Sequence, residues 1–197
     1  MAKSVAPAMP STPLTGRRAV LKGVVASGIC CLTPDIAIAQ SDPRSARPQA
    51  GDRFVFANGD RKGAVVRPDD VPMGGPPLTV YPQDTSGTTR DGSRLNQVIL
   101  IRLAASDLAE TMRVQAADGI VAYSAVCTHA GCDEWAWLGV QKMLKCPCHD
   151  SEFDPKDGAR VNVGPAPRRL PALPLKLVDG VLLAAGSFSA RVGFQPA

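Results

Sequence analysis

The stretches C-T-H-A-G-C at residues 127–132 and C-P-C-H at residues 146–149 contain both histidines and four of the six cysteines of the chain. Each stretch offers one cysteine and one histidine close together, Cys127 with His129 and Cys146 with His149, and a second cysteine. Thiolate sulfur and imidazole nitrogen are the ligands that soft and borderline transition metals prefer. Their concentration at short, fixed spacings predicts a metal centre held between two loops.

The spacing alone leaves the kind of metal open. Zinc accepts two thiolates and two imidazoles in a tetrahedron, so a structural zinc site is one interpretation. It would use four of the six clustered side chains and give no role to Cys132 and Cys148. Two structural disulfides are a further interpretation, but they would make both neighbouring histidines incidental.

The two stretches resemble the cluster-binding loops of the Rieske [2Fe-2S] family, in which two thiolates hold one iron and two imidazoles hold the other. The resemblance covers roughly residues 120–170, and residues 164–167 are similar to the proline-rich loop that covers the cluster in that family. It implies one [2Fe-2S] cluster with four ligands: Cys127 and Cys146 on one iron, His129 and His149 on the other. It also implies that Cys132 and Cys148 form the disulfide that ties the two loops together in the high-potential branch.

Three residues after the second stretch bear on the reduction potential. Ser151 matches the serine that donates a hydrogen bond to a bridging sulfide in high-potential members of the family. Phe153 stands where those members commonly have a tyrosine that donates to a ligand sulfur, and phenylalanine has no hydroxyl. Asp150 replaces a common glycine and adds a negative charge, which favours the oxidised cluster. The resemblance thus implies a potential lower than that of the quinol-oxidising enzymes.

The remaining pattern predicts an all-β domain with stacked antiparallel sheets, as in the Rieske fold. Short apolar runs separated by proline and glycine are typical of antiparallel strands. They lie at residues 53–57, 64–66, 78–81, 98–103, 120–126, 143–145, 173–178 and 181–185. The Asp179-Gly180 pair predicts a two-residue hairpin turn, and residues 154–158 predict another turn. One short helix is expected over residues 106–117, with Ser106 as its cap and Gly119 at its end.

The first 39 residues have the features of an export signal. Arg17 and Arg18 precede an apolar stretch and resemble the twin-arginine signal of bacteria, although a general secretory signal with a basic start is the alternative. Small residues at Ala37 and Ala39 predict cleavage before Gln40. The apolar run is shorter than the about 20 residues that a membrane anchor needs.

Beyond this signal, we expect a flexible leader at residues 40–51 and a Rieske domain at residues 52–197, with its cluster-binding part at about residues 120–170. Removal of residues 1–39 lowers the count of Lys and Arg from 22 to 18 and that of Asp and Glu from 18 to 17. The mature chain is therefore nearly neutral and lacks the basic stripe of a nucleic-acid-binding protein. Its cysteines all lie in the two stretches, and an oxidising periplasm would preserve a disulfide between them.

The sequence favours an electron-transfer subunit over a catalyst that acts by itself, because both histidines are assigned to the cluster and none remains for a second metal triad. The signal and residues 151–154 resemble the small subunit of arsenite oxidase, where the cluster passes electrons from a molybdenum subunit to a soluble cytochrome. Residues 164–170 are more similar to the Rieske subunit of quinol:cytochrome c oxidoreductases. We therefore expect a periplasmic protein whose partners are a molybdenum oxidoreductase subunit or a c-type cytochrome.

Two alternatives remain. A quinol-oxidising subunit on the periplasmic face of the inner membrane would need an anchor that is retained after export. An oxygenase-linked ferredoxin is disfavoured, because such cytosolic proteins typically lack both the two disulfide cysteines and an export signal.

Overall fold

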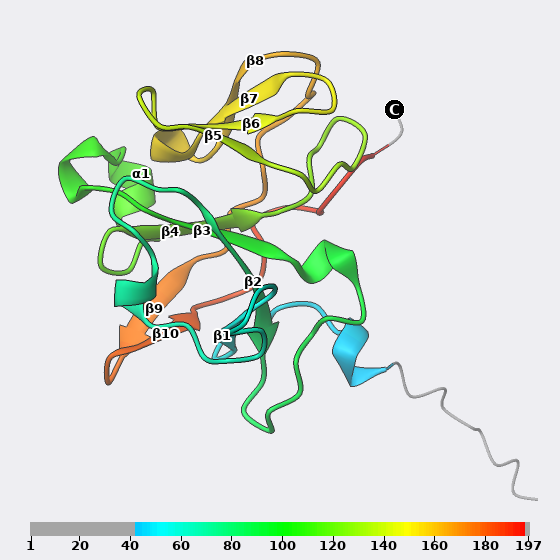
Figure 1. The fold of residues 1–197 in the computed structure, drawn as a ribbon, viewed down its shortest axis with the longest axis vertical. Coiled ribbons are helices and arrows are strands. Elements are labelled where there is room, and N and C mark those ends of the chain that lie inside the picture. Colours follow the sequence, from blue (N-terminus) through cyan, green and yellow to red (C-terminus); the bar gives the residue numbers. More distant parts are fainter. Residues whose placement is uncertain (1–41, 196–197) are drawn as a thin grey trace, which may run out of the picture. The chain divides into compact units, whose positions relative to one another are not determined.

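The computed structural model describes residues 42–195 of the chain. The expected export signal at residues 1–39 and the expected cleavage before Gln40 lie outside the described residues. Within residues 42–195, no helix is long and apolar enough to cross a membrane. The described part is nearly all β-structure, in two antiparallel sheets (Figure 1).

The larger sheet has six strands, and it closes on itself. In spatial order they are β4 (Ile120–Ser124), β3 (Val98–Arg102), β2 (Leu78–Gln83), β1 (Arg53–Phe56), β10 (Val181–Ala184) and β9 (Leu175–Val178). The segment that leads into β9 pairs with β4, because Ser124 N donates to Pro171 O and Leu173 N donates to Ala122 O, both at 2.9 Å. The strand β4 at the sheet edge is thereby covered.

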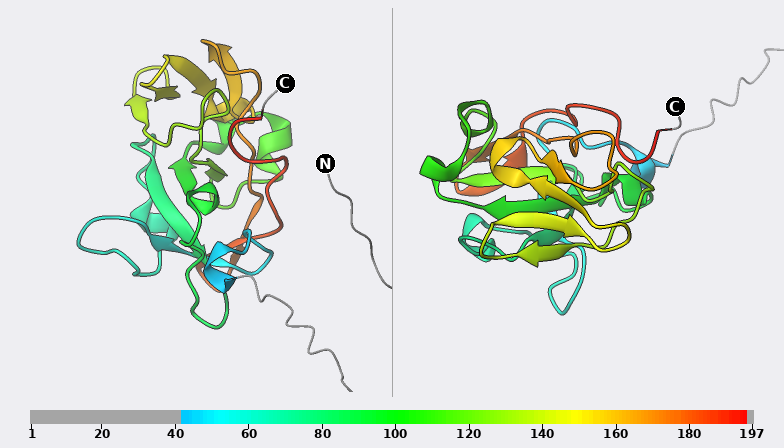
Figure 2. Two further views of the ribbon diagram at one scale, coloured as in Figure 1. Left: turned by 90° about the vertical axis from the view of Figure 1, so that its right-hand side faces the viewer. Right: turned by 90° about the horizontal axis from the view of Figure 1, so that it is seen from above.

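The smaller sheet lies against one face of β3 and β4, as both Figure 1 and Figure 2 show. Its strands, in order, are β5 (Ala136–Leu138), β6 (Met143–Cys146), β7 (Ser151–Asp154) and β8 (Arg160–Val163). Sequence patterns predicted only β6 of these four. The strand β5 has only three residues, and β7 and β8 have four each with polar side chains among them, so none contains an apolar run long enough to stand out.

The continuous apolar character of β3 and β4 follows from their position between two cores. Ile99 and Tyr123 face the core shared with the small sheet, whereas Leu100 and Ala122 face the interior of the large sheet. All five residues of β4 are buried. A strand that is buried on both faces has no solvent side on which polar residues could alternate.

The helix prediction was only partly right. Residues 106–117 form a 3-10 turn at Ala105–Asp107 and then a single helical turn, α1 (Glu110–Arg113), whose cap is Ala109 rather than Ser106. Leu108 between them is extended, which places its side chain in the core at 2% exposure and interrupts the helix. The segment ends in a turn at Gly119, where a Cβ atom would lie 2.4 Å from Leu103 O.

The other turns agree with the sequence. Asp179 and Gly180 have positive φ values of 49° and 76° and join β9 to β10, as a two-residue hairpin requires. Residues 155–157 form a 3-10 turn that ends at Gly158 in the left-handed region. The apolar run at residues 64–66 differs, because it makes only an isolated bridge between Val65 and Val55.

The part of the expected leader that the structure describes is attached to the domain. Residues 43–45 form a 3-10 turn, and Gly51 N donates to Ala184 O at 2.9 Å. The fully buried side chain of Asn96 donates to Ala46 O at 2.8 Å. Residues 42–51 therefore run along the domain with defined hydrogen bonds.

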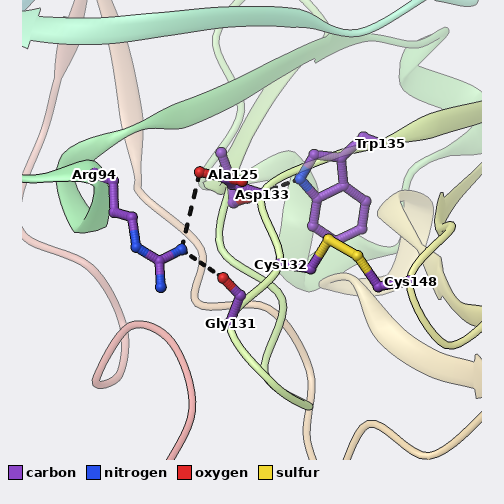
Figure 3. Close-up of a disulfide and its surroundings, with 7 residues drawn as sticks. All are labelled: Arg94, Ala125, Gly131, Cys132, Asp133, Trp135 and Cys148. Atoms are coloured by element: carbon purple, nitrogen blue, oxygen red, sulfur yellow. Dashed lines mark hydrogen bonds and ion pairs between the residues drawn. A yellow bond between two sulfur atoms is a disulfide. The ribbon is translucent and has the colours of Figure 1, made fainter.

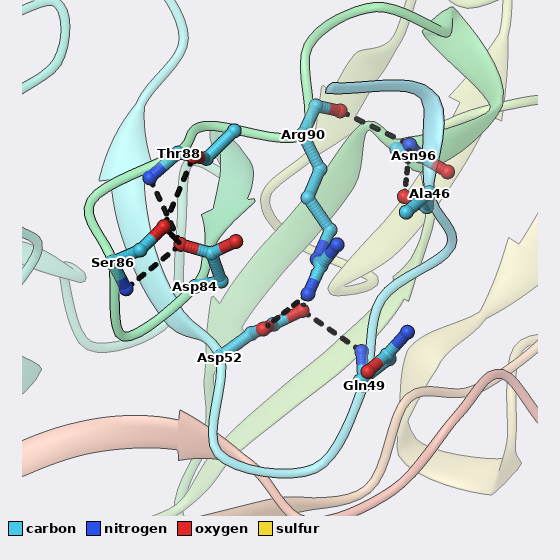
Figure 4. Close-up of polar contacts among 8 residues, drawn as sticks. All are labelled: Ala46, Gln49, Asp52, Asp84, Ser86, Thr88, Arg90 and Asn96. Carbon is cyan, nitrogen blue, oxygen red and sulfur yellow. Dashed lines mark hydrogen bonds and ion pairs between the residues drawn. The ribbon is translucent and has the colours of Figure 1, made fainter. Parts of the chain in front are cut away.

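A buried ion pair fixes the place where this segment meets the sheet (Figure 4). The side chains of Arg90 and Asp52 are 7% and 4% exposed, and Arg90 Nε and Nη2 donate to the two carboxylate oxygens at 2.6 and 3.0 Å. Asp52 also accepts from Gln49 N at 2.8 Å, and Arg90 O accepts from Asn96 Nδ2 at 3.1 Å. The pair thus connects the start of β1 to the loop that precedes β3.

The substitution Asp52→Ala should lower the free energy of unfolding by about 3–5 kcal/mol, because it leaves the guanidinium group of Arg90 buried without its carboxylate. The midpoint of urea unfolding, followed by circular dichroism, measures this loss. Asp107→Ala is the matched control: its ion pair with Lys142 is 33% and 38% exposed, and its loss should cost less than about 1 kcal/mol. An equal effect of both substitutions would contradict a structural role for the buried pair.

Candidate metal centre

Two loops, one after β4 and one after β6, carry the predicted ligands. The first loop follows β4, which ends at Ser124, and the second begins at Cys146, the last residue of β6. The first loop closes on itself, because Cys127 N donates to Cys132 O at 2.7 Å and Gly131 N donates to Cys127 O at 3.1 Å. These two hydrogen bonds turn the backbone of the loop back toward Cys127.

The four predicted ligands form two pairs in the structure, the thiols in one core cluster and the imidazoles in contact with each other. Cys127 and Cys146 are free thiols, each 1% exposed. The rings of His129 and His149 lie edge to face with their centroids 4.6 Å apart. His129 is half-buried, whereas His149 is exposed. The site thus has a buried sulfur side and a nitrogen side that reaches the surface.

One feature of these side chains fits a bound metal cluster. The Nδ1 atom of His129 is buried and has no hydrogen-bond partner among the described residues, so it is available as a ligand atom. Burial, opposed in part by a hydrogen bond from the backbone of His129, raises the pKa of the Cys127 thiol to about 11. A metal that binds this thiol must therefore displace its proton.

The predicted disulfide between Cys132 and Cys148 is confirmed, and it joins the two loops (Figure 3). The Cα atoms of the two residues are 6.6 Å apart. The sulfur atoms of both lie within 4.8 Å of the Cys146 sulfur. Since this bond uses both cysteines, Cys127 and Cys146 are the free thiols of the two loops.

Trp135 connects the first loop to the apolar core, a role that the sequence did not reveal. Its Nε1 donates to Ala125 O at 2.8 Å (Figure 3). Its ring packs edge to face on Phe153 at a centroid distance of 5.6 Å. Trp137 is likewise used within the domain, because its Nε1 donates to Gly74 O at 3.1 Å. Both indoles therefore contribute to local packing.

Hydrogen bonds connect the loops to the proline-rich segment at residues 164–167. The hydroxyl of Ser151, fully buried, accepts from Ala166 N at 3.1 Å and keeps its own hydrogen available for donation. Thr128, which lies between two predicted ligands, donates from Oγ1 to Arg168 O at 2.6 Å. A Cβ atom on Gly164 would lie 2.5 Å from Ser151 Cα, so this close approach requires glycine. The sequence pointed to Ser151 but not to Thr128.

The two other residues that the resemblance singled out occupy different environments. Phe153 is fully buried, in the same apolar cluster as the two free thiols. Asp150 is on the surface with a side-chain exposure of 74%, and it forms an ion pair with Lys145 at 2.8 Å. Lys145 lowers the pKa of Asp150 through this hydrogen bond. The positive charge of Lys145 therefore offsets part of the negative charge that Asp150 adds near His149.

Comparison with known proteins points to one family. The Rieske [2Fe-2S] domain matches residues 64–174. A protein of Haloferax mediterranei that is named as a putative Rieske subunit of a respiratory nitrate reductase is 38% identical to this chain over 121 residues. The match covers 60% of this chain and 52% of that protein. The Rieske iron-sulfur subunit of the cytochrome bc1 complex of Mycobacterium bovis is 34% identical over 146 residues, or 65% of this chain and 34% of that protein.

The chain spans about half the length of the first of these relatives and a third of the second. Among solved structures, the soluble domain of Rieske protein II from Sulfolobus acidocaldarius is similar to this chain. It has 23% sequence identity, a TM-score of 0.36 and coverage of 73% of each chain.

Replacement of both disulfide cysteines, in the variant Cys132→Ala with Cys148→Ala, should weaken the site without removing a predicted ligand. A disulfide that closes a loop of this length, 16 residues, stabilises a protein by about 3 kcal/mol. We expect a lower midpoint of urea unfolding. We also expect the visible absorption of the purified protein to be lost faster after an iron chelator is added. The control is Asp133→Ala in the same loop, whose ion pair with Arg94 is long, at 3.8 Å, and exposed. Equal rates of loss for the two variants would show that the disulfide does not hold the loops.

Proposed function

The chain belongs to the Rieske [2Fe-2S] family, and from this membership we propose that it is an exported one-electron-transfer protein or subunit. It would pass electrons between a periplasmic oxidoreductase and a cytochrome. The observation that supports this most is that the two loops carry two free thiols buried in one core cluster and two imidazoles in contact with each other, one of them exposed. When bound, the single [2Fe-2S] cluster of such a domain supplies reversible one-electron chemistry.

In this proposal Cys127 and Cys146 hold one iron and His129 and His149 hold the other. Both thiols lie in the apolar core between the small sheet and β3–β4, which excludes water from the sulfur side. His149 is exposed, so its imidazole edge is the point at which a partner could approach closely. The chain thus separates a shielded face from a face for electron exchange.

Other side chains would set the potential and the geometry of the site. Ser151 is buried next to the second loop with a hydroxyl hydrogen free to donate toward a cluster sulfur. Hydrogen bonds to sulfur favour the reduced state and raise the potential. Thr128 and the proline-rich segment would keep the first loop in position through the bond to Arg168 O.

The relatives support a role within a larger assembly. Some are named as subunits of cytochrome bc1 complexes, and one as a putative subunit of a respiratory nitrate reductase. By analogy, a molybdenum oxidoreductase subunit or a c-type cytochrome is the proposed partner. The twin-arginine-type signal expected at residues 1–39 is the support for a periplasmic location. N-terminal sequencing of the protein from a periplasmic fraction should find a mature start at Gln40.

A quinol-oxidising subunit of a cytochrome bc-type complex is the second candidate, favoured by the identity of 34–41% to subunits of that kind. The two candidates differ in where the protein is found and in what reduces it. Recovery in the membrane fraction, together with reduction by a quinol in the presence of copurified cytochromes, would favour this second candidate.

The central experiment is analysis of the purified protein for iron, labile sulfide and electrons. We expect two iron and two sulfide ions per chain, as one cluster of this type requires, and a reductive titration that consumes a single electron. A colourless protein that contains zinc would contradict the proposal. The single variants Cys127→Ser and His149→Ala should lose the cluster, whereas Lys176→Gln, on the exposed part of β9, should retain it.

Phe153→Tyr should raise the reduction potential if the new hydroxyl donates to a ligand sulfur. A hydrogen bond that is about 1 kcal/mol stronger in the reduced state corresponds to roughly 40 mV for one electron. Protein-film voltammetry measures this shift. Phe188→Tyr is the control, because Phe188 packs against the other core, inside the large sheet. The reduction potential of this variant should equal that of the wild type. No rise for Phe153→Tyr would mean that the side chain at position 153 does not face a ligand.

A further inference from the structure

We propose that a basic groove beside the first loop, lined by Arg47, Arg94 and Arg191, docks an acidic surface of the redox protein that exchanges electrons with this chain. The groove has a volume of about 330 Å³. Such docking presupposes the electron transfer proposed above, and it adds the surface that is used and the charge of the partner.

The groove is next to the predicted ligands. Its lining includes Val126, Ala130 and Gly131. Val126 directly precedes Cys127, and Ala130 directly follows His129. A protein seated on the groove would therefore lie against the loop that presents one of the two imidazoles.

Backbone carbonyl oxygens hold three arginines at or near this groove. The bonds run from Arg47 Nη1 to Leu95 O at 3.2 Å, from Arg94 Nη1 to Gly131 O at 2.5 Å (Figure 3), and from Arg168 Nη2 to Gly193 O at 2.5 Å. A carbonyl dipole orients a guanidinium group without cancelling its charge, and each group keeps further N–H donors free. The arginines are thus positioned for a ligand that carries carboxylates.

The positive charge of this region is largely unpaired. Among residues 42–195, Arg47, Arg168 and Arg191 form no ion pair with a carboxylate. Arg94 has only Asp133, at 3.8 Å and with both side chains about half exposed. Burial and the nearby charge of Arg191 lower the pKa of Arg168, so these two cations lie close enough to repel each other. Like charges held together without counter-charges favour an anionic partner.

The composition of the groove favours a protein over a small anion. Phe194, which also lines it, is 55% exposed. Arginine and aromatic side chains are enriched at the centres of protein interfaces. An acidic partner would be steered to the groove at low ionic strength, and its association rate would fall as salt screens the attraction.

The test is stopped-flow electron transfer from the reduced, cluster-containing protein to two soluble c-type cytochromes of similar size, one acidic and one basic. We expect faster transfer to the acidic cytochrome at low salt, and a rate constant that falls with ionic strength. Arg47→Gln and Arg191→Gln should each lower that rate constant by about threefold to tenfold. Lys176→Gln removes one charge from β9, away from the groove lining, and should leave the rate constant unchanged.

Iron and sulfide content and direct voltammetry of each variant separate this proposal from the one on which it rests. A wild-type protein that exchanges no electron with an electrode would overturn the electron-transfer function itself. Normal voltammetry with rate constants unaffected by Arg47→Gln and Arg191→Gln would overturn the docking groove alone. Faster transfer to the basic cytochrome would overturn it too. So would arginine-dependent cosedimentation with anionic phospholipid vesicles in place of any preference for the acidic cytochrome, because the groove would then serve a membrane surface.

Discussion

The position of β3 and β4 between two apolar cores is the constraint on which the rest of the structure depends. One face of these strands packs inside the large sheet, and the other packs against the small sheet. A one-residue shift would exchange the side chains of the two faces, and neither core would then be filled by the side chains that fit it. The end of β4 then delivers the first loop, while the same core buries the thiols of both loops. Stability and the geometry of the candidate centre therefore have a common origin.

Around that constraint, the two loops are held by contacts of several kinds. The disulfide joins them covalently, Trp135 supports the first loop from the core, and Ser151 and Thr128 bind the proline-rich segment. A metal centre needs its ligands in place before the metal arrives if binding is not to cost conformational entropy. The contacts made by the chain itself would lower this entropic cost.

Charge is distributed unevenly over the surface near this centre. Asp150 beside His149 is balanced by Lys145, whereas the arginines next to the first loop are oriented by carbonyl oxygens and have few carboxylate neighbours. The buried pair Arg90–Asp52, in contrast, is fully matched and serves the fold. The buried pair thus serves the fold, whereas the arginines of the groove keep their charge for the partner that is proposed to bind there.

The sequence by itself predicted the residues of the proposed centre and determined most of the strands, because ligand chemistry and two-sided burial leave local patterns. It failed where the pattern depends on distant contacts. The expected helix at residues 106–117 is reduced to one turn because Leu108 reaches the core. The strand β5 is too short to be recognised locally, and β7 and β8 are short and partly polar. Only the tertiary structure decided that Trp135 and Thr128 support the loops, and that Arg47, Arg94 and Arg191 meet in one groove. These residues come from segments far apart in the chain, and folding alone brings their side chains together.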